Sequence, residues 1–199
     1  MKSITVCFLG PDGSGKSTII NGLLAQDLPF NRNDYFHLKP VKQSKSNKNV
    51  VVTDPHSAPV YSKFKSFIKL FYYVLLYNVG WVKNIIPLKT KSSLIIFDRF
   101  YDDILVDNRR FRYGGSIGLT KFVRLFIPRP KLYFILTAKA DIIYKRKQEV
   151  SLAELNRQIL LYRNLGDGKR YFNIDVNRTP EKIVKEITNI LINNLNERS

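Results

Sequence analysis

The chain has 199 residues, with 33 Lys and Arg against 16 Asp and Glu, and a formal net charge of +17. This length suits one compact domain and leaves little room for a second hydrophobic core. Cys7 is the one cysteine of the sequence, which excludes a disulfide framework and is typical of a reducing compartment. The first residues do not resemble a secretory signal. We therefore expect a single cytoplasmic domain over residues 1–199.

The first third of the chain begins with a strand pattern and ends in a polar stretch. A short apolar run at 4–9 predicts a strand that is buried on both faces of a parallel sheet. A helix is expected over about 16–25, and a weaker strand at 35–38. Residues 41–59 are polar and rich in Lys, Ser and Asn, which predicts a long loop. This loop holds Lys42, Lys45, Lys48, Asp54, Pro55 and His56.

A helical pattern with many aromatic residues follows over about 61–86. Its aromatic residues include Phe64, Phe67, Phe71, Tyr72, Tyr73, Tyr77 and Trp81. Lys69 interrupts the pattern, and the uncharged stretch is short for a membrane-spanning helix. We expect this helix to cover the sheet, and a peripheral membrane contact is the alternative.

The rest of the chain alternates between strand and helix patterns. Strands are predicted at 94–97, 132–136 and 171–174, and helices at 141–149, at 151–165 and from Thr179-Pro180 onward. A polar turn with Gly114, Gly115 and Gly118 leads into a short helix that stops before Pro128. This alternation predicts an α/β fold, a doubly wound α/β/α sandwich with a parallel sheet. Such sheets bind ligands at the carboxyl ends of their strands.

The glycine-rich segment after the first strand carries the strongest chemical signal. Gly10-Pro11-Asp12-Gly13-Ser14-Gly15-Lys16-Ser17 fits the P-loop pattern G-x-x-x-x-G-K-[ST], and it stands between a predicted strand and a predicted helix. Backbone N–H groups and the helix N-terminus make such a loop a binding site for phosphate. We therefore predict ATP binding, and the phosphate-binding residues are Gly10, Gly13, Ser14, Gly15, Lys16, Ser17 and Thr18.

A second motif, Asp98-Arg99, ends the strand at 94–97. A carboxylate after four apolar residues is the Walker-B pattern, so Asp98 and the Ser17 hydroxyl are the candidate ligands of Mg²⁺. The alternative is an aspartate that caps a turn. The planar guanidinium of Arg99 suits bidentate binding of an acceptor phosphate or carboxylate.

Residues 8–18 together with Asp98-Arg99-Phe100 resemble the thymidylate kinase family of P-loop nucleoside monophosphate kinases. The resemblance implies a P-loop NTPase fold with a five-stranded parallel sheet and a small helical lid over about 140–160. It implies transfer of the γ-phosphate of Mg·ATP to dTMP. It further implies that Asp12 contacts the sugar hydroxyl of the acceptor and that Arg99 holds the acceptor phosphate.

The same resemblance implies a catalytic arginine either in the glycine loop or in the lid. The loop position is Gly13 here, so a lid arginine is expected. Arg146 is the candidate and Arg157 the reserve, with a solvated basic helix face as the alternative. Residues 174–178 resemble the last strand and the adenine-side loop of the family.

Two segments depart from the family pattern and concern the acceptor. The family's Arg-Glu-Pro-Gly-Gly segment is replaced by Leu38-Lys39-Pro40, and its Ala-Tyr-Gln segment by Val106-Asp107-Asn108. Residues 97–115 and Thr53-Asp54-Pro55-His56 are similar to thymidylate kinase-like proteins associated with bacterial surface-polysaccharide synthesis. The further candidates for acceptor binding are Tyr101, Arg109, Arg110 and Arg112, with a solvated basic turn as the alternative reading of the three arginines. His37 and His56 have no metal-ligand companions.

Three functions are consistent with these motifs. The first is a kinase of thymidylate type that uses ATP and Mg²⁺. The second is a kinase for a sugar or glycolipid acceptor, and the third is a non-catalytic nucleotide switch or a nucleic-acid-binding ATPase. The high positive charge fits either a polyanionic partner or a lysine-rich solvated surface, and no motif for specific nucleic-acid binding accompanies it. A homodimer and a peripheral membrane contact are both compatible with the sequence.

Overall fold

The computed structural model describes residues 3–41 and 58–196. Within them, five parallel strands form one sheet in the order β2-β3-β1-β4-β5. The strands are β1 Ile4–Leu9, β2 Arg32–His37, β3 Ser93–Asp98, β4 Leu132–Thr137 and β5 Tyr171–Asp175. Every residue of the three central strands is buried, as a sheet covered on both faces requires. The predicted P-loop α/β sandwich is confirmed.

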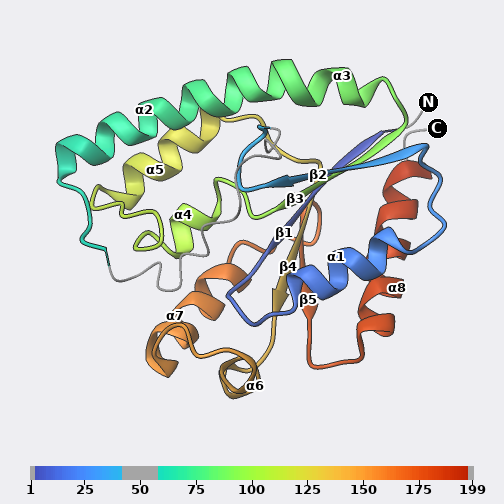
Figure 1. Ribbon diagram of the computed structural model, residues 1–199. Coiled ribbons are helices and arrows are strands. Elements are labelled where there is room, and N and C mark those ends of the chain that lie inside the picture. Colours follow the sequence, from blue (N-terminus) through green and yellow to red (C-terminus); the bar gives the residue numbers. More distant parts are fainter. Residues whose placement is uncertain (1–2, 42–57, 197–199) are drawn as a thin grey trace.

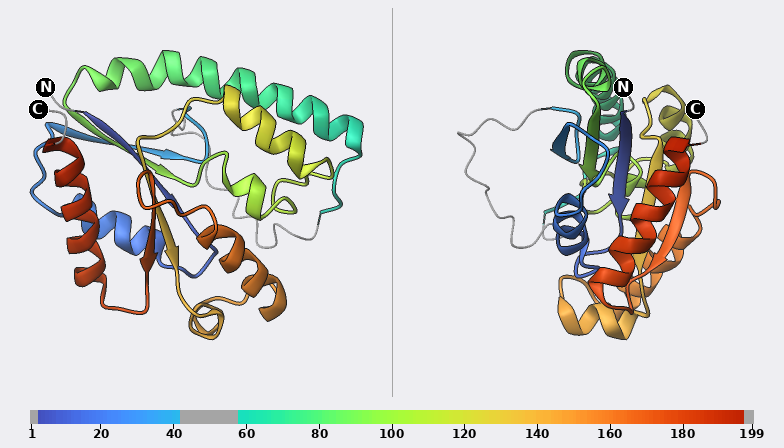
Figure 2. Two further views of the ribbon diagram at one scale, coloured as in Figure 1. Left: turned by 180° about the vertical axis from the view of Figure 1, so that it is seen from behind. Right: turned by 90° about the vertical axis from the view of Figure 1, so that its right-hand side faces the viewer.

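One face of the sheet packs against α1 Lys16–Leu24 and α8 Pro180–Asn196, which lie side by side (Figures 1 and 2). Successive residues of a strand point to opposite faces, so Val6 and Phe8 of β1 contribute to this core. Helices α6 Ala140–Arg146 and α7 Leu152–Arg163 follow β4 and add apolar side chains to the same core.

The other face packs against a long helical segment, which runs along the top of the molecule in Figure 1. It consists of α2 Lys63–Gly80, the π-helical turn Trp81–Ile85 and α3 Ile86–Lys89. The short helices α4 Asp103–Val106 and α5 Ile117–Val123, and the 3₁₀ turn Arg124–Phe126, complete this layer. Its core is rich in aromatic rings, among them Tyr77, Trp81, Phe97, Phe100 and Tyr133.

Several boundaries differ from the sequence prediction. Strand β2 begins at Arg32 and ends at His37, because Leu38 has a positive φ of 62° and leaves the strand. Gly118 belongs to α5 rather than to the turn before it, and α4 was not predicted, because four residues give no helical period. The predicted loop residues Lys42, Lys45, Lys48, Asp54, Pro55 and His56 lie outside the described residues. In the described parts of the chain, no helix is long and apolar enough to cross a membrane.

Candidate active site

The P-loop connects β1, the central strand of the sheet, to α1. Gly10, Gly13 and Gly15 have φ values of 141°, 82° and 82°, a region that residues with a Cβ rarely adopt. A Cβ on Gly10 would lie 2.4 Å from the carbonyl oxygen of Leu136. The loop can therefore take this path only with glycine, and it places the N-terminus of α1 at the carboxyl end of the sheet.

Lys16 is the first residue of α1, and its side chain is buried against the P-loop. Its ammonium group donates hydrogen bonds to the carbonyl oxygens of Gly10 at 2.8 Å and of Pro11 at 2.9 Å. Burial lowers the pKa of Lys16 to about 7, and the positive charge of Arg99 adds to this effect. The ammonium group therefore lies in an environment that favours a nearby anion.

Asp98 lies beside the P-loop because β3 pairs with β1, with Asp98 opposite Phe8. Its Oδ2 atom accepts a hydrogen bond of 2.9 Å from the Tyr35 hydroxyl, and Nδ1 of His37 lies 3.8 Å away. Burial raises the pKa of Asp98, but His37, Lys16, Tyr35 and Arg99 outweigh it, so the net pKa is below the usual value. Asp98 is therefore a carboxylate at neutral pH.

The Asp98 carboxylate also fits the predicted Mg²⁺ site. Its Oδ1 atom is buried and has no hydrogen-bond partner among the described residues. Oxygen atoms are the ligands that Mg²⁺ prefers, and the exposed Ser17 at the start of α1 can supply a second one. No group of three or more His, Cys, Asp or Glu in the described residues could hold a metal ion. Asp98 and Ser17 are the residues that would hold Mg²⁺ here.

Asp12, the acid of the P-loop, connects two arginines from the segment after β3. Its Oδ1 atom is 2.5 Å from Nη2 of Arg99, and its Oδ2 atom binds Nη2 of Arg110. Arg110 also contacts the carboxylates of Asp107 and Glu149, each at 3.3 Å. The P-loop, the segment after β3 and the segment after α6 thus meet at one charged network.

The guanidinium group of Arg99 is held from its other side by Asp103. Nη1 of Arg99 is 3.5 Å from Oδ1 of Asp103, which also accepts a 2.5 Å hydrogen bond from the Tyr162 hydroxyl of α7. Burial lowers the pKa of Arg99, yet Asp103 and the other nearby charges raise it above its usual value. Arg99 also has a positive φ of 69°, a backbone strain that occurs at functional sites. Arg99 is therefore a fixed positive charge at the end of β3.

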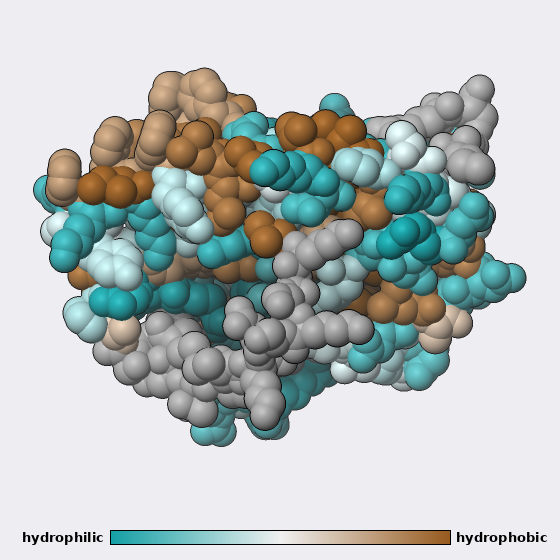
Figure 3. Space-filling model, turned by 45° about the horizontal axis from the view of Figure 1, so that its top comes forward, coloured by the Kyte–Doolittle hydropathy of each residue, from teal (hydrophilic) through white to brown (hydrophobic). Residues whose placement is uncertain are grey.

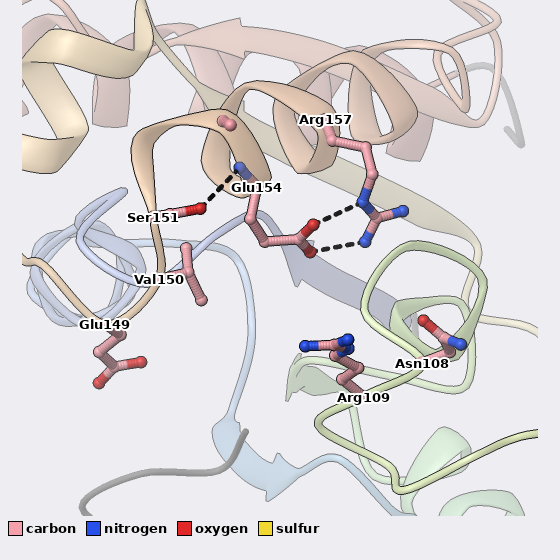
Figure 4. A pocket seen from close by; sticks show the side chains of 8 residues that line it. Asn108, Arg109, Glu149, Val150, Ser151, Glu154 and Arg157 are labelled. Atoms are coloured by element: carbon pink, nitrogen blue, oxygen red, sulfur yellow. Dashed lines mark hydrogen bonds and ion pairs between the residues drawn. The ribbon is translucent and has the colours of Figure 1, made fainter. Parts of the chain in front are cut away.

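A cavity of about 730 Å³ opens between the segment after α4 and the start of α7 (Figure 4). Arg109 and Asn108 line it from one side, and Glu149 and Arg157 from the other (Figure 4). Its further lining residues are Val150, Ser151, Ala153 and Glu154. Glu149 also binds Arg110, which connects this cavity to Asp12 of the P-loop.

A second cavity, of about 240 Å³, lies on the α1 side of the P-loop. Ser14, Gly15 and Thr18 line it together with Arg146, whose Nη2 atom donates a 3.2 Å hydrogen bond to the carbonyl oxygen of Val176. Its other lining residues are Ile19, Val176, Arg178, Pro180 and Ile183. The smaller cavity therefore lies at the P-loop, beside Arg146, whereas the larger one lies beside Arg109 and is connected to the P-loop through Glu149, Arg110 and Asp12.

The chain resembles proteins named thymidylate kinase over nearly its whole length. It is 25% identical over 206 aligned residues to a probable thymidylate kinase of Methanosarcina barkeri (94% of this chain, 95% of that protein). It is 22% identical over 221 aligned residues to the thymidylate kinase of Bacillus cereus (96% and 98%). The chain is thymidylate kinase-like.

Solved structures give the same assignment of the fold. The thymidylate kinase of Ehrlichia chaffeensis matches with a TM-score of 0.64 and 18% identity, over 96% of this chain and 100% of that one. The thymidylate kinase of Candida albicans matches with a TM-score of 0.66 and 17% identity, over 97% of this chain and 92% of that one. No protein-family model matches the chain.

Not all the predicted acceptor residues of this thymidylate kinase-like chain lie at the cavities. Tyr101 is buried in the aromatic core, where its hydroxyl donates a 3.0 Å hydrogen bond to the carbonyl oxygen of Thr120. The guanidinium carbon of Arg112 lies 4.4 Å from the ring centre of Tyr61, and its Nε donates to the carbonyl oxygen of Pro59. Of the three arginines in this turn, Arg109 lines the larger cavity and Arg110 binds Asp12, while Arg112 stacks on Tyr61.

The structure also brings residues to the site that the sequence did not indicate. Tyr35 and His37 reach Asp98 because β2 pairs with β3, and no sequence motif predicts that pairing. Asp103 and Tyr162 fix Arg99 from two helices that are far apart in the sequence. The spacing of Arg99 and Asp103, four residues apart, is the one signal that could have indicated part of this arrangement.

Proposed function

We propose that the chain is an ATP-dependent kinase that transfers the γ-phosphate of ATP to a nucleoside monophosphate of the thymidylate type. The observation that carries this proposal is the Asp12 network, in which one P-loop carboxylate holds Arg99 and Arg110 beside the P-loop. A P-loop can bind the phosphates of a nucleotide. The two arginines beside it can bind a second anion, such as the phosphate group of a phosphoryl acceptor.

In this proposal the smaller cavity receives the nucleoside of ATP. The planar guanidinium of Arg146 lines it beside the P-loop and is held by the Val176 carbonyl. Arg146, predicted from the sequence as the catalytic lid arginine, positions the base in this proposal, and Lys16 binds the outer phosphates from inside the loop. The backbone N–H groups of the loop and the N-terminus of α1 add positive potential at the same place.

The larger cavity receives the acceptor, with Arg99 and Arg110 on its phosphate. Because both guanidinium groups are tied to Asp12, little side-chain freedom is lost when the acceptor binds. Buried charges around the reacting oxygens also act at low dielectric, which strengthens their effect on the transferring group. Ser17 and Asp98 would hold Mg²⁺, which would supply positive charge next to the phosphates of ATP.

A panel of acceptors tests the proposal directly. ADP release from Mg·ATP is measured with the protein alone, and then with dTMP, with other nucleoside monophosphates and with sugars. The proposal expects stimulation by dTMP above all others. Stimulation by another nucleoside monophosphate would change the acceptor but keep the reaction. ADP release that no nucleoside monophosphate stimulates would contradict it.

One observation favours a sugar or glycolipid acceptor as the second candidate. The described side chains that line the larger cavity are polar, charged or small aliphatic, and none is aromatic. Nucleic acid bases are commonly bound by stacking on aromatic rings, whereas a hydroxyl-rich ligand needs polar partners. In the same panel, this candidate expects stimulation by a sugar and none by dTMP.

A further inference from the structure

A third cavity, of about 270 Å³, lies at the amino ends of three strands. Its lining residues are Ser3, Ile4, Thr5, Lys89, Arg129, Pro130, Lys131 and Arg170. Thr5 is the second residue of β1, Lys131 directly precedes β4, and Arg170 directly precedes β5. The P-loop begins at the other end of β1, at Gly10, about 16 Å from Thr5 at about 3.3 Å per residue. The cavity is therefore separate from the candidate active site.

The charged side chains that line this cavity are all positive among the described residues. Arg129, Lys131 and Arg170 line it from the segments before β4 and β5, and Lys89 lines it from the end of α3. Hydrophilic residues predominate at this end of the molecule, on the right of Figure 3, where α3 ends and β1 begins in Figure 1. Burial lowers the pKa of Arg129, and the positive charges of Arg124 and Arg170 lower it further. An anion in the cavity would offset this repulsion.

The buried carboxylate that acts on Arg129 already has other partners. Asp102 is 1% exposed, and its charge favours the charged form of Arg129. Its Oδ1 atom, however, binds Nε of Arg124 and accepts a 3.2 Å hydrogen bond from the Tyr171 hydroxyl. Asp102 therefore moderates the charge of Arg129 from a distance but forms its ion pair with Arg124.

The turn before β5 fixes the backbone of Arg170 and occupies the nearest carboxylate in the sequence. Oδ1 of Asp167 accepts hydrogen bonds of 2.7–2.9 Å from the backbone N–H groups of Lys169, Arg170 and Tyr171. The carbonyl oxygen of Arg170 accepts a 2.7 Å hydrogen bond from the backbone N–H of Tyr133. The Arg170 side chain therefore starts from a fixed position at the cavity.

The segment before β4 is also fixed, because a proline stands on either side of Arg129. The rings of Pro128 and Pro130 lock their own φ angles, and a residue that precedes proline is confined to extended conformations. The backbone N–H of Lys131 donates hydrogen bonds to the carbonyl oxygen of Thr5 at 2.9 Å and to its Oγ1 atom at 3.0 Å. Little backbone freedom is therefore lost when a ligand binds in the cavity.

Two hydroxyl groups add neutral donors to the same walls. Thr5 is 3% exposed, and its hydroxyl oxygen accepts the hydrogen bond from Lys131. The hydroxyl oxygen of Ser3 accepts a 2.9 Å hydrogen bond from the backbone N–H of Ser93. Since a hydroxyl group both accepts and donates, each keeps its own O–H group as a donor. Cationic side chains together with hydroxyl donors are the partners that phosphate oxygens require.

We propose that this cavity is a second anion-binding site, which takes the phosphate group of a small phosphorylated ligand. The planar guanidinium groups of Arg129 and Arg170 bind the phosphate oxygens, and Lys131 and the Thr5 hydroxyl add further donors. The volume lies just below the range of about 300–1,000 Å³ that is typical of ligand pockets, so the cavity suits a phosphate group with a small substituent rather than a whole nucleotide. This site goes beyond the proposed kinase reaction and does not depend on its acceptor.

A titration followed by the backbone amide signals of the ¹⁵N-labelled full chain tests the proposal. The P-loop is first saturated with Mg²⁺ and a non-hydrolysable ATP analogue, and the salt is kept at about 0.05 M so that screening stays weak. Inorganic phosphate and ribose 5-phosphate are then added in separate titrations. We expect saturable shifts at the amides of Thr5, Lys131 and Arg170. Tighter binding of inorganic phosphate would assign the site to the free anion, and tighter binding of ribose 5-phosphate would assign it to a phosphorylated sugar.

Two double variants separate a specific site from diffuse attraction by the net charge. Arg129→Ala/Arg170→Ala should lower the affinity at least about tenfold, because charge-assisted hydrogen bonds to the phosphate are lost. Lys182→Ala/Lys185→Ala removes the same charge from two exposed lysines of α8 and should leave the affinity within about twofold. The dispersion of the amide signals shows whether each variant is folded.

Three results would overturn the proposal. The first is the absence of saturable shifts at Thr5, Lys131 and Arg170 in the unchanged protein, a result that no variant is needed to obtain. The second is a set of shifts confined to the surroundings of Asp12 and Arg110, which would place the anion in the candidate active site. The third is an equal loss of affinity in both double variants.

Discussion

Arg110 and Arg112 stand two residues apart in one turn but have different surroundings, which gives a sharp test of the site. Arg110 contacts the carboxylates of Asp12, Asp107 and Glu149, whereas Arg112 stacks on Tyr61. We predict that Arg110→Ala lowers kcat/KM for the acceptor about a hundredfold, and that Arg112→Ala changes it less than threefold.

The magnitude follows from the contacts of each side chain. A hydrogen bond to a charged group contributes about 1.5–3 kcal/mol, and the Arg110 guanidinium is 23% exposed, so solvent screens it only in part. Arg110→Ala removes both the contact with the acceptor and the ion pair with Asp12. Together these losses raise the activation free energy by about 3 kcal/mol, which lowers kcat/KM roughly a hundredfold. Arg112 would lose a cation–π contact of about 0.5–1 kcal/mol, away from both cavities.

The assay measures kcat and KM for the best acceptor at saturating Mg·ATP. A third variant, Arg110→Lys, keeps the charge but loses the planar fork, and it should fall between the other two, about tenfold below the unchanged protein. Equal activities of Arg110→Ala and Arg112→Ala would refute the assignment of Arg110 to the acceptor site.

Three further predictions concern the P-loop. Lys16→Ala should lower the rate about a hundredfold, or roughly 3 kcal/mol, in steady-state kinetics, and a wild-type rate would contradict its role. The pKa of Lys16 is about 7, and bound phosphate favours the ammonium form, so ATP binding at pH 8 should be accompanied by proton uptake. Calorimetry in two buffers measures this uptake, and its absence would be inconsistent with a neutral Lys16 in the free protein. Gly13 and Gly15 share a φ of 82°, but only a Cβ on Gly13 would contact α6 and Lys147, at 3.0 Å from Lys147 Cβ. Gly13→Ala should therefore lower Tm by several degrees more than Gly15→Ala, and equal values would argue against that contact.

The sequence was sufficient for the parts of the fold that depend on local patterns. The buried strands, the P-loop and the Walker-B position of Asp98 each have a short motif, and all occupy the predicted elements. The N-cap of α7 was also predictable, since Ser151 accepts a hydrogen bond from the Glu154 backbone N–H.

The rest of the site depends on contacts between distant segments, which short motifs do not encode. Tyr35 meets Asp98 through the pairing of an exposed edge strand whose polar residues gave only a weak strand pattern. Arg110 and Arg112 have the same chemistry and nearly the same position in the sequence. Only the path of the turn, with Arg112 at a positive φ of 50°, directs one to Asp12 and the other to Tyr61.

The most direct test of the central claim is transfer of labelled phosphate from [γ-³²P]ATP to dTMP by the purified protein, with Lys16→Ala as the control. The account predicts labelled dTDP that depends on Mg²⁺ and falls about a hundredfold in Lys16→Ala. If the protein neither binds ATP nor transfers its γ-phosphate to any acceptor, the assignment of this P-loop to a kinase is wrong.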